Sequence, residues 1–446
     1  MKPYLIVFVI LFISLPIKVQ GQKKISGTVQ SQTDSTSLEF AHIYLKNSTI
    51  GTYSNSEGQF VLHYPDTSSY DTLVISRIGY GECIIPLLSS NTATSFSIYV
   101  QESKSYLDEV VITTHKDTVA AIVKKALRSM RKNYPTKLHY LEGFYRELSL
   151  RDDQYTRLIE ASIGITESSY RQAQTTSKVK VRQIRKSEDY REYSWKFKRN
   201  EDIMNKMVKL AWGKQYAHHN NIYRLLLNNT VRSNRNLSSG KKKKATDFVS
   251  KYDFEIAKVT KVDDEIYYHI NYKKPLESSA LGYFSGSMVI NMNDYAIVEH
   301  SWGKYQHPYK ENKFLNLYYK KQFLYKFHII YSKIEDKYYP TYFESFEHSM
   351  RGTALYEDEE TGEKKAQFNK ITFMVNQVVT KKRDFDRIKK REALEDELDL
   401  YDVDQAYDSA FWANYNILLI DPLLKPAIED LEKEKSLNKQ FENNGE

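Results

Sequence analysis

The amino-acid sequence predicts a mainly β protein with some α structure, in which a small β-sandwich is followed by an α+β unit built on an antiparallel sheet. Short runs with apolar residues at every second position recur at even spacing between Ile25 and Val100, which is typical of a sandwich. Strand patterns rich in tyrosine fill residues 252–380 and are separated by short polar turns. One helical apolar stripe lies between the two regions and predicts a packing helix.

The chain begins with a pattern typical of a secretory signal. Lys2 precedes an apolar run from Tyr4 to Pro16, and a short segment ending at Gly21 follows. The run is shorter than the roughly 20 residues that a membrane-spanning helix needs. We therefore expect residues 1–21 to be removed, and the protein to be exported to the periplasm or the outer membrane. No later run is comparable, so we expect no transmembrane helix in the mature chain and at most peripheral membrane association.

Length and composition narrow the class of protein. A chain of 446 residues is long enough for two or three domains. A formal net charge of +8 would suit binding to nucleic acid, but an exported protein is separated from nucleic acid. Acidic components of the envelope are therefore the better class of partner. Basic residues gather between Lys178 and Arg199 and at residues 241–244, where we expect solvated faces or loops. The one cysteine, Cys83, cannot form an internal disulfide and is expected to be a small buried hydrophobe.

The strands of the predicted sandwich are separated by glycine-containing turns. Ala41, Ile43 and Leu45 alternate with polar or larger residues, which places them on one face of a strand. Residues 55–58 and 78–81 contain the glycines that tight connections require.

The segments ISGTV, FAHIYLKNSTIGTYSNSEGQFVL and DTLVISRIGYGE resemble the carboxypeptidase-like regulatory domain, a transthyretin-like β-sandwich of exported proteins in Gram-negative bacteria. In that family the domain is an accessory module without catalytic residues, so the resemblance implies none here. The next segment, YLDEVVIT at residues 106–113, resembles the TonB box that follows this domain in TonB-dependent transporters. The plug and large barrel of such transporters have no counterpart in the pattern that follows it.

A helix is expected from Asp117 or Thr118, either of which could cap it, to Pro135, which ends it. Its apolar residues recur at helical spacing and form one stripe, which we expect to pack across the following sheet. The residues of the stripe are Val119, Ile122, Val123, Ala126, Leu127 and Met130.

Strands and helices alternate in the central part of the chain. Residues 138–150 and 155–165 predict a hairpin around a turn at residues 151–153. Helices are expected at residues 201–212 and 217–228, and the lysine run at residues 241–244 suits an exposed loop.

The sheet that follows is predicted to be an antiparallel meander. Its hairpin turns are expected at Asp263 and Asp264, at Asn293 and Asp294, and at Glu335 and Asp336. The segment GYFSGSMVINMNDYAIVEHSW resembles the strand pairs of lipoprotein-localisation-like folds. That resemblance implies a curved sheet that half encloses an apolar cavity closed by helices.

The last part of the chain is expected to cover the sheet. Phe411, Trp412, Ile417 and Leu418 predict an apolar plug at one end of the sheet, and a polar helix is expected after Pro426. The order of GFYRE, the sheet region and FWANYNIL resembles exported proteins in which the same regulatory domain precedes a domain without an assigned activity. This resemblance implies architecture and compartment.

These patterns predict five segments. They are a signal peptide at 1–21, the regulatory β-sandwich at 22–103, a linker with the TonB-box-like segment at 104–116, the helix and curved sheet at 117–400, and a C-terminal helical segment at 401–446.

Few residues suggest catalysis. His139 and Glu142 match the HxxE pair that binds zinc in metallocarboxypeptidases, but in a strand they would point to opposite faces, and no third ligand is apparent. The neighbouring His218 and His219 face different directions on a helix and cannot easily share an ion. The sequence contains no HExxH, G-x-S-x-G, Walker or G-x-G-x-x-G motif.

We therefore assign no catalytic, cofactor-binding or metal-binding residue and expect no cofactor. The leading hypothesis is a non-enzymatic exported envelope protein that binds an envelope protein or a lipid-like ligand, with an apolar ligand or a partner's segment in the curved sheet. Two alternatives stay open. The HxxE pair suggests a metal-dependent hydrolase of peptide or glycan, and YLDEVVIT suggests an accessory component of TonB-dependent outer-membrane transport.

Overall fold

The computed structural model describes most of the chain. The described ranges are residues 22–66, 72–87, 95–103, 116–151, 154–170, 177–190, 221–229, 231, 248–274, 283–305, 323–348, 355–357, 364–395, 398–421 and 424–443. The predicted signal peptide, the YLDEVVIT segment, the helix expected at residues 201–212 and the lysine run at residues 241–244 lie outside these ranges.

Two small sheets form the N-terminal sandwich. The first contains β1 (Gln22–Ser31), β4 (Gln59–Pro65) and β7 (Ser95–Val100), and β1 pairs antiparallel with β4 and parallel with β7. The second is antiparallel in the order β3-β2-β5-β6 and contains β2 (His42–Leu45), β3 (Gly51–Tyr53), β5 (Thr72–Ser76) and β6 (Cys83–Pro86).

The sandwich core confirms the predicted alternation. Ala41, Ile43 and Leu45 are fully buried and share one apolar cluster with Phe60 and Leu62 of the opposite sheet. The predicted turn before β4 needs its glycine, because Gly58 has a φ of +71° and a Cβ there would lie 2.2 Å from the Val29 carbonyl oxygen.

Helix α3 (Lys116–Asn133) crosses the large sheet as predicted. It begins at Lys116, so the N-cap predicted at Asp117 or Thr118 is misplaced by one or two residues and both lie in the first turn. Every member of the predicted stripe except Ile122 is buried, and Ile122 packs against the same core as a partly buried side chain. Hydrophobic burial of one helix face therefore fixes α3 on the sheet.

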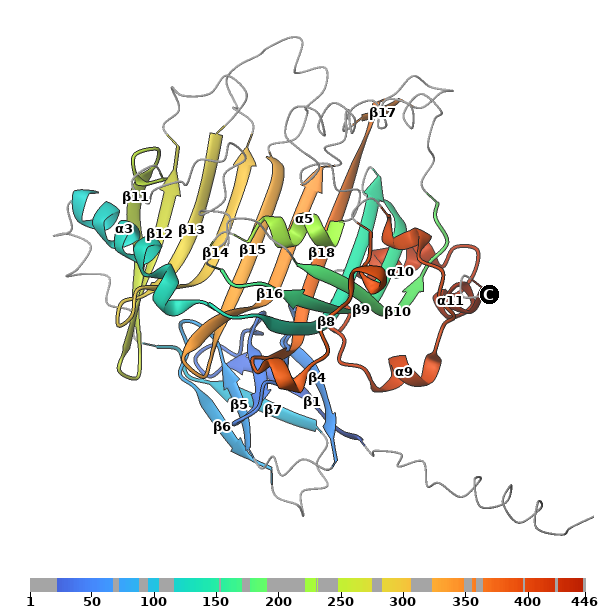
Figure 1. The fold of residues 1–446 in the computed structure, drawn as a ribbon, viewed down its shortest axis with the longest axis horizontal. Helices are drawn as coiled ribbons and strands as arrows, with labels where there is room; N and C mark the ends of the chain where they lie inside the picture. Colours follow the sequence, from blue (N-terminus) through green and yellow to red (C-terminus); the bar gives the residue numbers. More distant parts are fainter. Residues whose placement is uncertain are drawn as a thin grey trace, which may run out of the picture.

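The second unit is one large antiparallel sheet, as predicted, and Figure 1 shows its curvature. The order of the strands along the sheet is β10-β9-β8-β18-β16-β15-β14-β13-β12-β11. The strands are β8 (His139–Arg151), β9 (Gln154–Glu167), β10 (Lys178–Lys186), β11 (Asp253–Val262), β12 (Glu265–Lys273), β13 (Tyr283–Asn291), β14 (Ala296–Tyr305), β15 (Phe323–Ile334), β16 (Lys337–His348) and β18 (Lys364–Val379), while the short β17 (Leu355–Glu357) pairs with β18.

Most neighbours in this sheet are consecutive in the chain, and β8 with β18 is the main exception. The hairpin of β8 and β9 and the three turns predicted from polar turn-forming pairs are confirmed by the strand boundaries. The pairing of β8 with β18 joins residues more than 200 positions apart, from Arg151 with Gln367 to Tyr140 with Val379. Of the helix expected at residues 217–228, the described part is α5 (Asn221–Leu227), which packs against the same side of the sheet as α3.

Residues 381–395, 398–421 and 424–443, here called the C-terminal segment, wrap around the β8–β10 end of the sheet. The segment contains three 3₁₀ turns, η3 (Lys382–Asp384), η4 (Lys390–Glu392) and η5 (Leu400–Asp402), and α9 (Ser409–Asn414), α10 (Lys425–Leu431) and α11 (Leu437–Asn443). The predicted single polar helix after Pro426 is wrong, because two short helices bury Ala427, Leu431, Leu437 and Phe441 against β8 and β9.

The residues of the predicted apolar plug do pack against the sheet. They lie on the face beside the sandwich and not at one end of the sheet. Trp412 is buried against Phe144 and Met374, and Phe411, Ile417 and Leu418 pack around the same cluster. None of the helices in the described ranges has the length and hydropathy that crossing a membrane requires.

Shortening an α3 stripe residue tests the role of the helix as a brace. Met130 is buried in the core, so Met130→Ala is expected to lower the free energy of unfolding by about 2–5 kcal/mol in a denaturant titration. The matched control is Arg128→Ala on the exposed face of the same helix, with an expected change within about 0.5 kcal/mol. Equal effects of the two substitutions would contradict packing of this stripe on the sheet.

Candidate functional site

The two residues of the HxxE pattern lie on β8, and their side chains point to opposite faces of the sheet. His139 is buried, its Nδ1 atom lies 3.2 Å from the Lys137 carbonyl oxygen, and its ring packs edge-on against Tyr339. Glu142 is half-buried on the other face, where it accepts a hydrogen bond from the Tyr140 hydroxyl at 3.3 Å. The pair cannot converge on one ion. Within the described ranges, no three His, Cys, Asp or Glu side chains are grouped so that they could hold a metal.

The other residues considered from the sequence contribute no site. Cys83 lies on β6, packs against the sandwich core and is half-buried, and burial raises the pKa of its thiol. A raised pKa disfavours the reactive thiolate. His218 and His219 lie outside the described residues.

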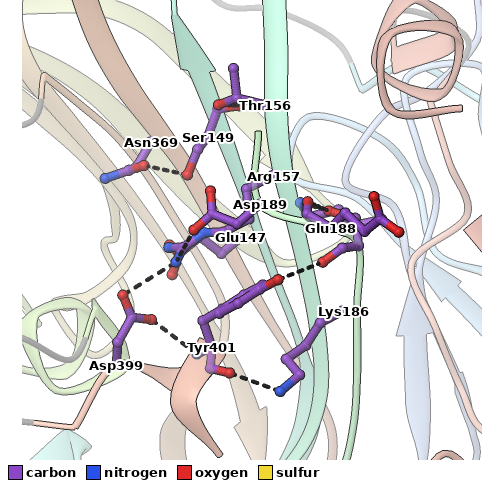
Figure 2. A network of polar contacts seen from close by, with 12 residues as sticks. Glu147, Ser149, Thr156, Arg157, Lys186, Glu188, Asp189, Asn369, Asp399 and Tyr401 are labelled. Carbon is purple, nitrogen blue, oxygen red and sulfur yellow. Dashed lines mark hydrogen bonds and ion pairs between the residues drawn. The ribbon is translucent and has the colours of Figure 1, made fainter. Parts of the chain in front are cut away.

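Two buried ionic networks surround the GFYRE sequence of β8. Glu147 points to the α3 side of the sheet, where it accepts a hydrogen bond from Arg157 at 2.5 Å and one from the Tyr145 hydroxyl at 2.6 Å. Arg157 also donates to Asp399 of the C-terminal segment at 3.2 Å, as Figure 2 shows. Lys186 completes the network by donating to the Tyr401 carbonyl oxygen at 2.8 Å.

The neighbouring residue on β8, Arg146, points to the opposite face. Arg146 and Arg185 both bind Glu160, at 2.6 and 2.5 Å, and Arg146 also donates to the Leu418 carbonyl oxygen at 2.8 Å. Burial raises the pKa of Glu160, but the guanidinium groups of Arg185 and Arg146 outweigh burial and hold this pKa below its ordinary value.

These networks correct the expectation that the basic residues from Lys178 onward form a solvated face or loop. Arg185 and Lys186 are adjacent on β10, so they point to opposite faces and enter the two networks. Because the charged groups of the networks bind one another and the C-terminal segment, we interpret the networks as structural.

A cleft of about 690 Å³ lies between the sandwich and the large sheet, and we call it the sandwich–sheet cleft. The sandwich contributes the strand and turn from Phe40 to Thr49, and the sheet contributes the turn between β15 and β16 and the start of β12. Seven aromatic or imidazole rings lie along it, and charged side chains of both signs accompany them. The rings belong to Phe40, His42, Tyr44, Tyr53, Tyr267, Tyr331 and Tyr338.

His42 lines the sandwich side of this cleft. Its ring stacks between Tyr44 and Tyr53, with centroid distances of 4.8 Å to each. Burial lowers the pKa of His42 to about 4, so the imidazole is neutral at pH 7. The stack therefore presents an uncharged aromatic surface.

Contacts deeper in the interface hold the sandwich on the sheet. The Tyr53 hydroxyl lies 2.6 Å from the Thr341 hydroxyl, and burial raises the pKa of Tyr53 to about 12. Phe40 packs edge-on against His328, and Arg77 lies 3.6 Å from Glu299. Both modules are thus needed to form the cleft.

Sequence reasoning missed this cleft. The alternation of β2 indicated that His42 and Tyr44 lie on the face opposite Ile43, but no pattern connected them with Ser332, whose hydroxyl lies 3.3 Å from His42 Nδ1. The available signal was two aromatic residues on the outer face of a sandwich strand, which is unusual for a solvated surface.

Comparisons with known proteins identify the N-terminal module. Residues 25–112 match the family model of the CarboxypepD_reg-like domain, so the resemblance seen in the sequence is confirmed. The chain is also 27% identical over 140 residues to the TonB-dependent receptor P3 of Formosa agariphila. That similarity covers 30% of this chain and 13% of the receptor.

Two solved structures are similar in outline. A LolA superfamily protein from Nitrosomonas europaea is matched over 62% of this chain and 98% of its own, with 10% identity and a TM-score of 0.21. A domain of an outer membrane lipoprotein-sorting protein from Vibrio parahaemolyticus is matched over 59% of this chain and 92% of its own, with 7% identity and a TM-score of 0.22. Similarity of this degree does not extend to a ligand or a site.

Breaking the Arg157 network should destabilise the protein. Arg157→Met leaves Glu147 charged and buried, so we expect a loss of about 3–5 kcal/mol in the free energy of unfolding, measured with denaturant. The double variant Arg157→Met/Glu147→Gln should recover part of this loss. Lys433→Met, which removes the exposed partner of Asp430, is the control and should cost at most about 1 kcal/mol. A loss no larger than that of the control would show that the network does not hold the segment.

Glu160 should contribute to stability in a pH-dependent way. Its pKa in the folded protein lies below the ordinary value of 4.5, so its ionisation stabilises the fold above that pH. This contribution is lost as the pH falls through the lowered pKa of the folded state. Denaturant titrations between about pH 6 and pH 2 should therefore show the difference between wild type and Glu160→Gln shrinking towards acid. A constant difference would contradict the lowered pKa.

Proposed function

We propose that this chain is a non-enzymatic exported envelope protein that binds a lipid-like, amphipathic ligand in the sandwich–sheet cleft. The observation that carries the proposal is the cleft itself. Its volume of about 690 Å³ falls within the range of about 300–1,000 Å³ for small-molecule sites, which form preferentially between domains.

The lining suits a ligand with an apolar body and a polar end. The neutral stack of Tyr44, His42 and Tyr53 offers aromatic surface to an apolar chain. Arg77 and Glu82 lie at the same cleft and provide charged partners for a polar head group.

The cleft is a better position for such a ligand than the α3 side of the sheet. Beneath α3, Tyr134 stacks on Tyr170 and packs against Tyr331 and Tyr338, so the protein's own side chains fill this region. An apolar ligand there would have to displace a packed core, which costs several kcal/mol.

The CarboxypepD_reg-like domain and the likeness to a TonB-dependent receptor support the proposed place in the envelope, in the periplasm or at the outer membrane. The alternative occupant of the same cleft is a segment of a partner protein. The receptor likeness also favours, as a second candidate, an accessory role in TonB-dependent transport, which cross-linking between TonB and residues 106–113 would reveal. The hydrolase hypothesis gains no support, because His139 and Glu142 point to opposite faces.

Filling the cleft should abolish ligand binding. Thr49 lies in the turn that lines the cleft, and Thr49→Trp adds an indole to that wall. After incubation with an extract of envelope lipids, native mass spectrometry should show a lipid adduct on the wild type and at least a tenfold weaker adduct on the variant, on the order expected for a blocked pocket.

The matched control places the same indole elsewhere on the sandwich. Thr36 lies on an exposed turn outside the cleft, so Thr36→Trp should bind lipid as the wild type does. Equal lipid adducts on both variants would show that the ligand binds outside the cleft. A wild type that binds no lipid but binds extended apolar peptides would favour a partner's segment instead.

A further inference from the structure

A second cavity, of about 710 Å³, lies where β8, β10 and β18 meet the C-terminal segment, and we call it the strap crevice. Tyr140 and Glu142 of β8 form one wall, Arg182 of β10 forms another, and residues 384–389 of the C-terminal segment lie opposite. The ring of Phe385 stacks on that of Tyr140, with a centroid distance of 5.6 Å and an interplanar angle of 22°. The crevice shares no lining residue with the sandwich–sheet cleft, although both cavities are lined by residues of β18.

One tyrosine hydroxyl connects two opposite charges in this crevice. The Tyr140 hydroxyl donates to Glu142 Oε2 at 3.3 Å and accepts a hydrogen bond from Arg182 Nη2 at 2.8 Å. Burial raises the pKa of Tyr140 to about 12, so the hydroxyl keeps its proton at pH 7. Among the described residues, Glu142 and Arg182 form no ion pair with each other or with a third side chain. A guanidinium has five N–H donors and a carboxylate has about four acceptor positions, so most of their capacity is unused.

The charges around the crevice are balanced. Lys180, Arg182, Arg387 and Lys389 carry four positive charges, and Glu142, Asp384, Asp386 and Glu392 carry four negative charges. A site for a simple anion or a simple cation would show an excess of the opposite charge. The balance favours a ligand that carries both charges.

A cluster of buried polar groups lies near this pair of charges. Ser162 is fully buried and Asn376 is 6% exposed. Burial raises the pKa of Tyr415, hydrogen bonding with Ser162 and Asn376 lowers it, and the nearby Glu142 and Tyr140 raise it. The three side chains therefore face one another, close to the wall of the crevice that Tyr140 and Glu142 form.

We propose that the strap crevice binds a small zwitterion, with its carboxylate or phosphate on Arg182 and its ammonium on Glu142. Two sources share this chemistry, a free amino acid or short peptide and the head group of a zwitterionic lipid. The site is independent of the proposed lipid-like ligand of the cleft, because the two cavities share no lining residue.

Binding can be measured on the full chain by isothermal titration calorimetry. The zwitterionic probes are glycylglycine and glycerophosphoethanolamine, and the singly charged probes are acetate, inorganic phosphate and ethanolamine. We expect at least one zwitterion to bind about tenfold or more tightly than every singly charged probe, because only a zwitterion engages both charges. Preference for glycylglycine would indicate a peptide or amino-acid source, and preference for glycerophosphoethanolamine a lipid head group.

Variants with a neutral side chain test whether Glu142 and Arg182 bind the two charges of the zwitterion. Glu142→Gln and Arg182→Gln should each weaken zwitterion binding by about tenfold or more. Lys390→Gln, on the exposed side of the same C-terminal segment and outside the crevice, is the matched control and should leave binding unchanged. Thermal unfolding of each variant checks that the fold is retained, and Glu142 and Arg182 are exposed enough for this to be expected.

The proposal is overturned if no zwitterion binds, if phosphate or ethanolamine binds as tightly as the zwitterions, or if Glu142→Gln and Arg182→Gln bind like Lys390→Gln. Thr49→Trp in the cleft should not change these results, so a failure here is distinguishable from a failure of the cleft proposal.

Discussion

The pairing of β8 with β18 is the constraint on which the rest of the structure depends. It joins the two ends of the large-sheet unit into one sheet, and it places GFYRE in the interior of that sheet. Side chains in a strand alternate between faces, so Arg146 and Glu147 are buried on opposite sides. An unpaired buried charge costs several kcal/mol. Each therefore requires a partner on its own side, and Glu160 and Arg157 of β9 are those partners.

The C-terminal segment provides further partners for these buried charged groups. Its Asp399 binds Arg157 on one face, and its Leu418 carbonyl oxygen accepts from Arg146 on the other. Between these points the chain passes the outer edge of β10, where Gln405 donates to the Arg182 carbonyl oxygen at 2.7 Å. An exposed edge strand invites pairing with other chains. The segment thus covers the edge while it connects the two ionic networks, and it encloses the strap crevice against β8 and β10.

The sequence allowed the local structure to be predicted, because local structure depends on periodicity. The strands of the sandwich, the stripe of α3 and the turns at polar pairs are all periodic or turn-forming signals, and the structure confirms them. The alternation of side chains along a strand also correctly predicted that His139 and Glu142 point to opposite faces of the sheet. The basic run was misjudged, because whether Arg185 is solvated depends on Glu160 on the neighbouring strand and on Trp412, more than 200 residues further along. Neither cavity could be predicted, since each is formed by segments that meet only in the folded chain.

The positions of the two cavities have a common physical origin. On the α3 side, helices lie directly on the sheet and its aromatic side chains interdigitate, so the space is filled. The sandwich and the C-terminal segment also bury apolar clusters against the sheet, one around Tyr53 and Trp412 and one around Leu431. The two cavities lie where turns and loop residues of these segments face the sheet. The chemistry of each space then depends on which segment faces the sheet: an aromatic sandwich strand gives a cleft rich in rings, and a segment of alternating charge gives a crevice with both charges.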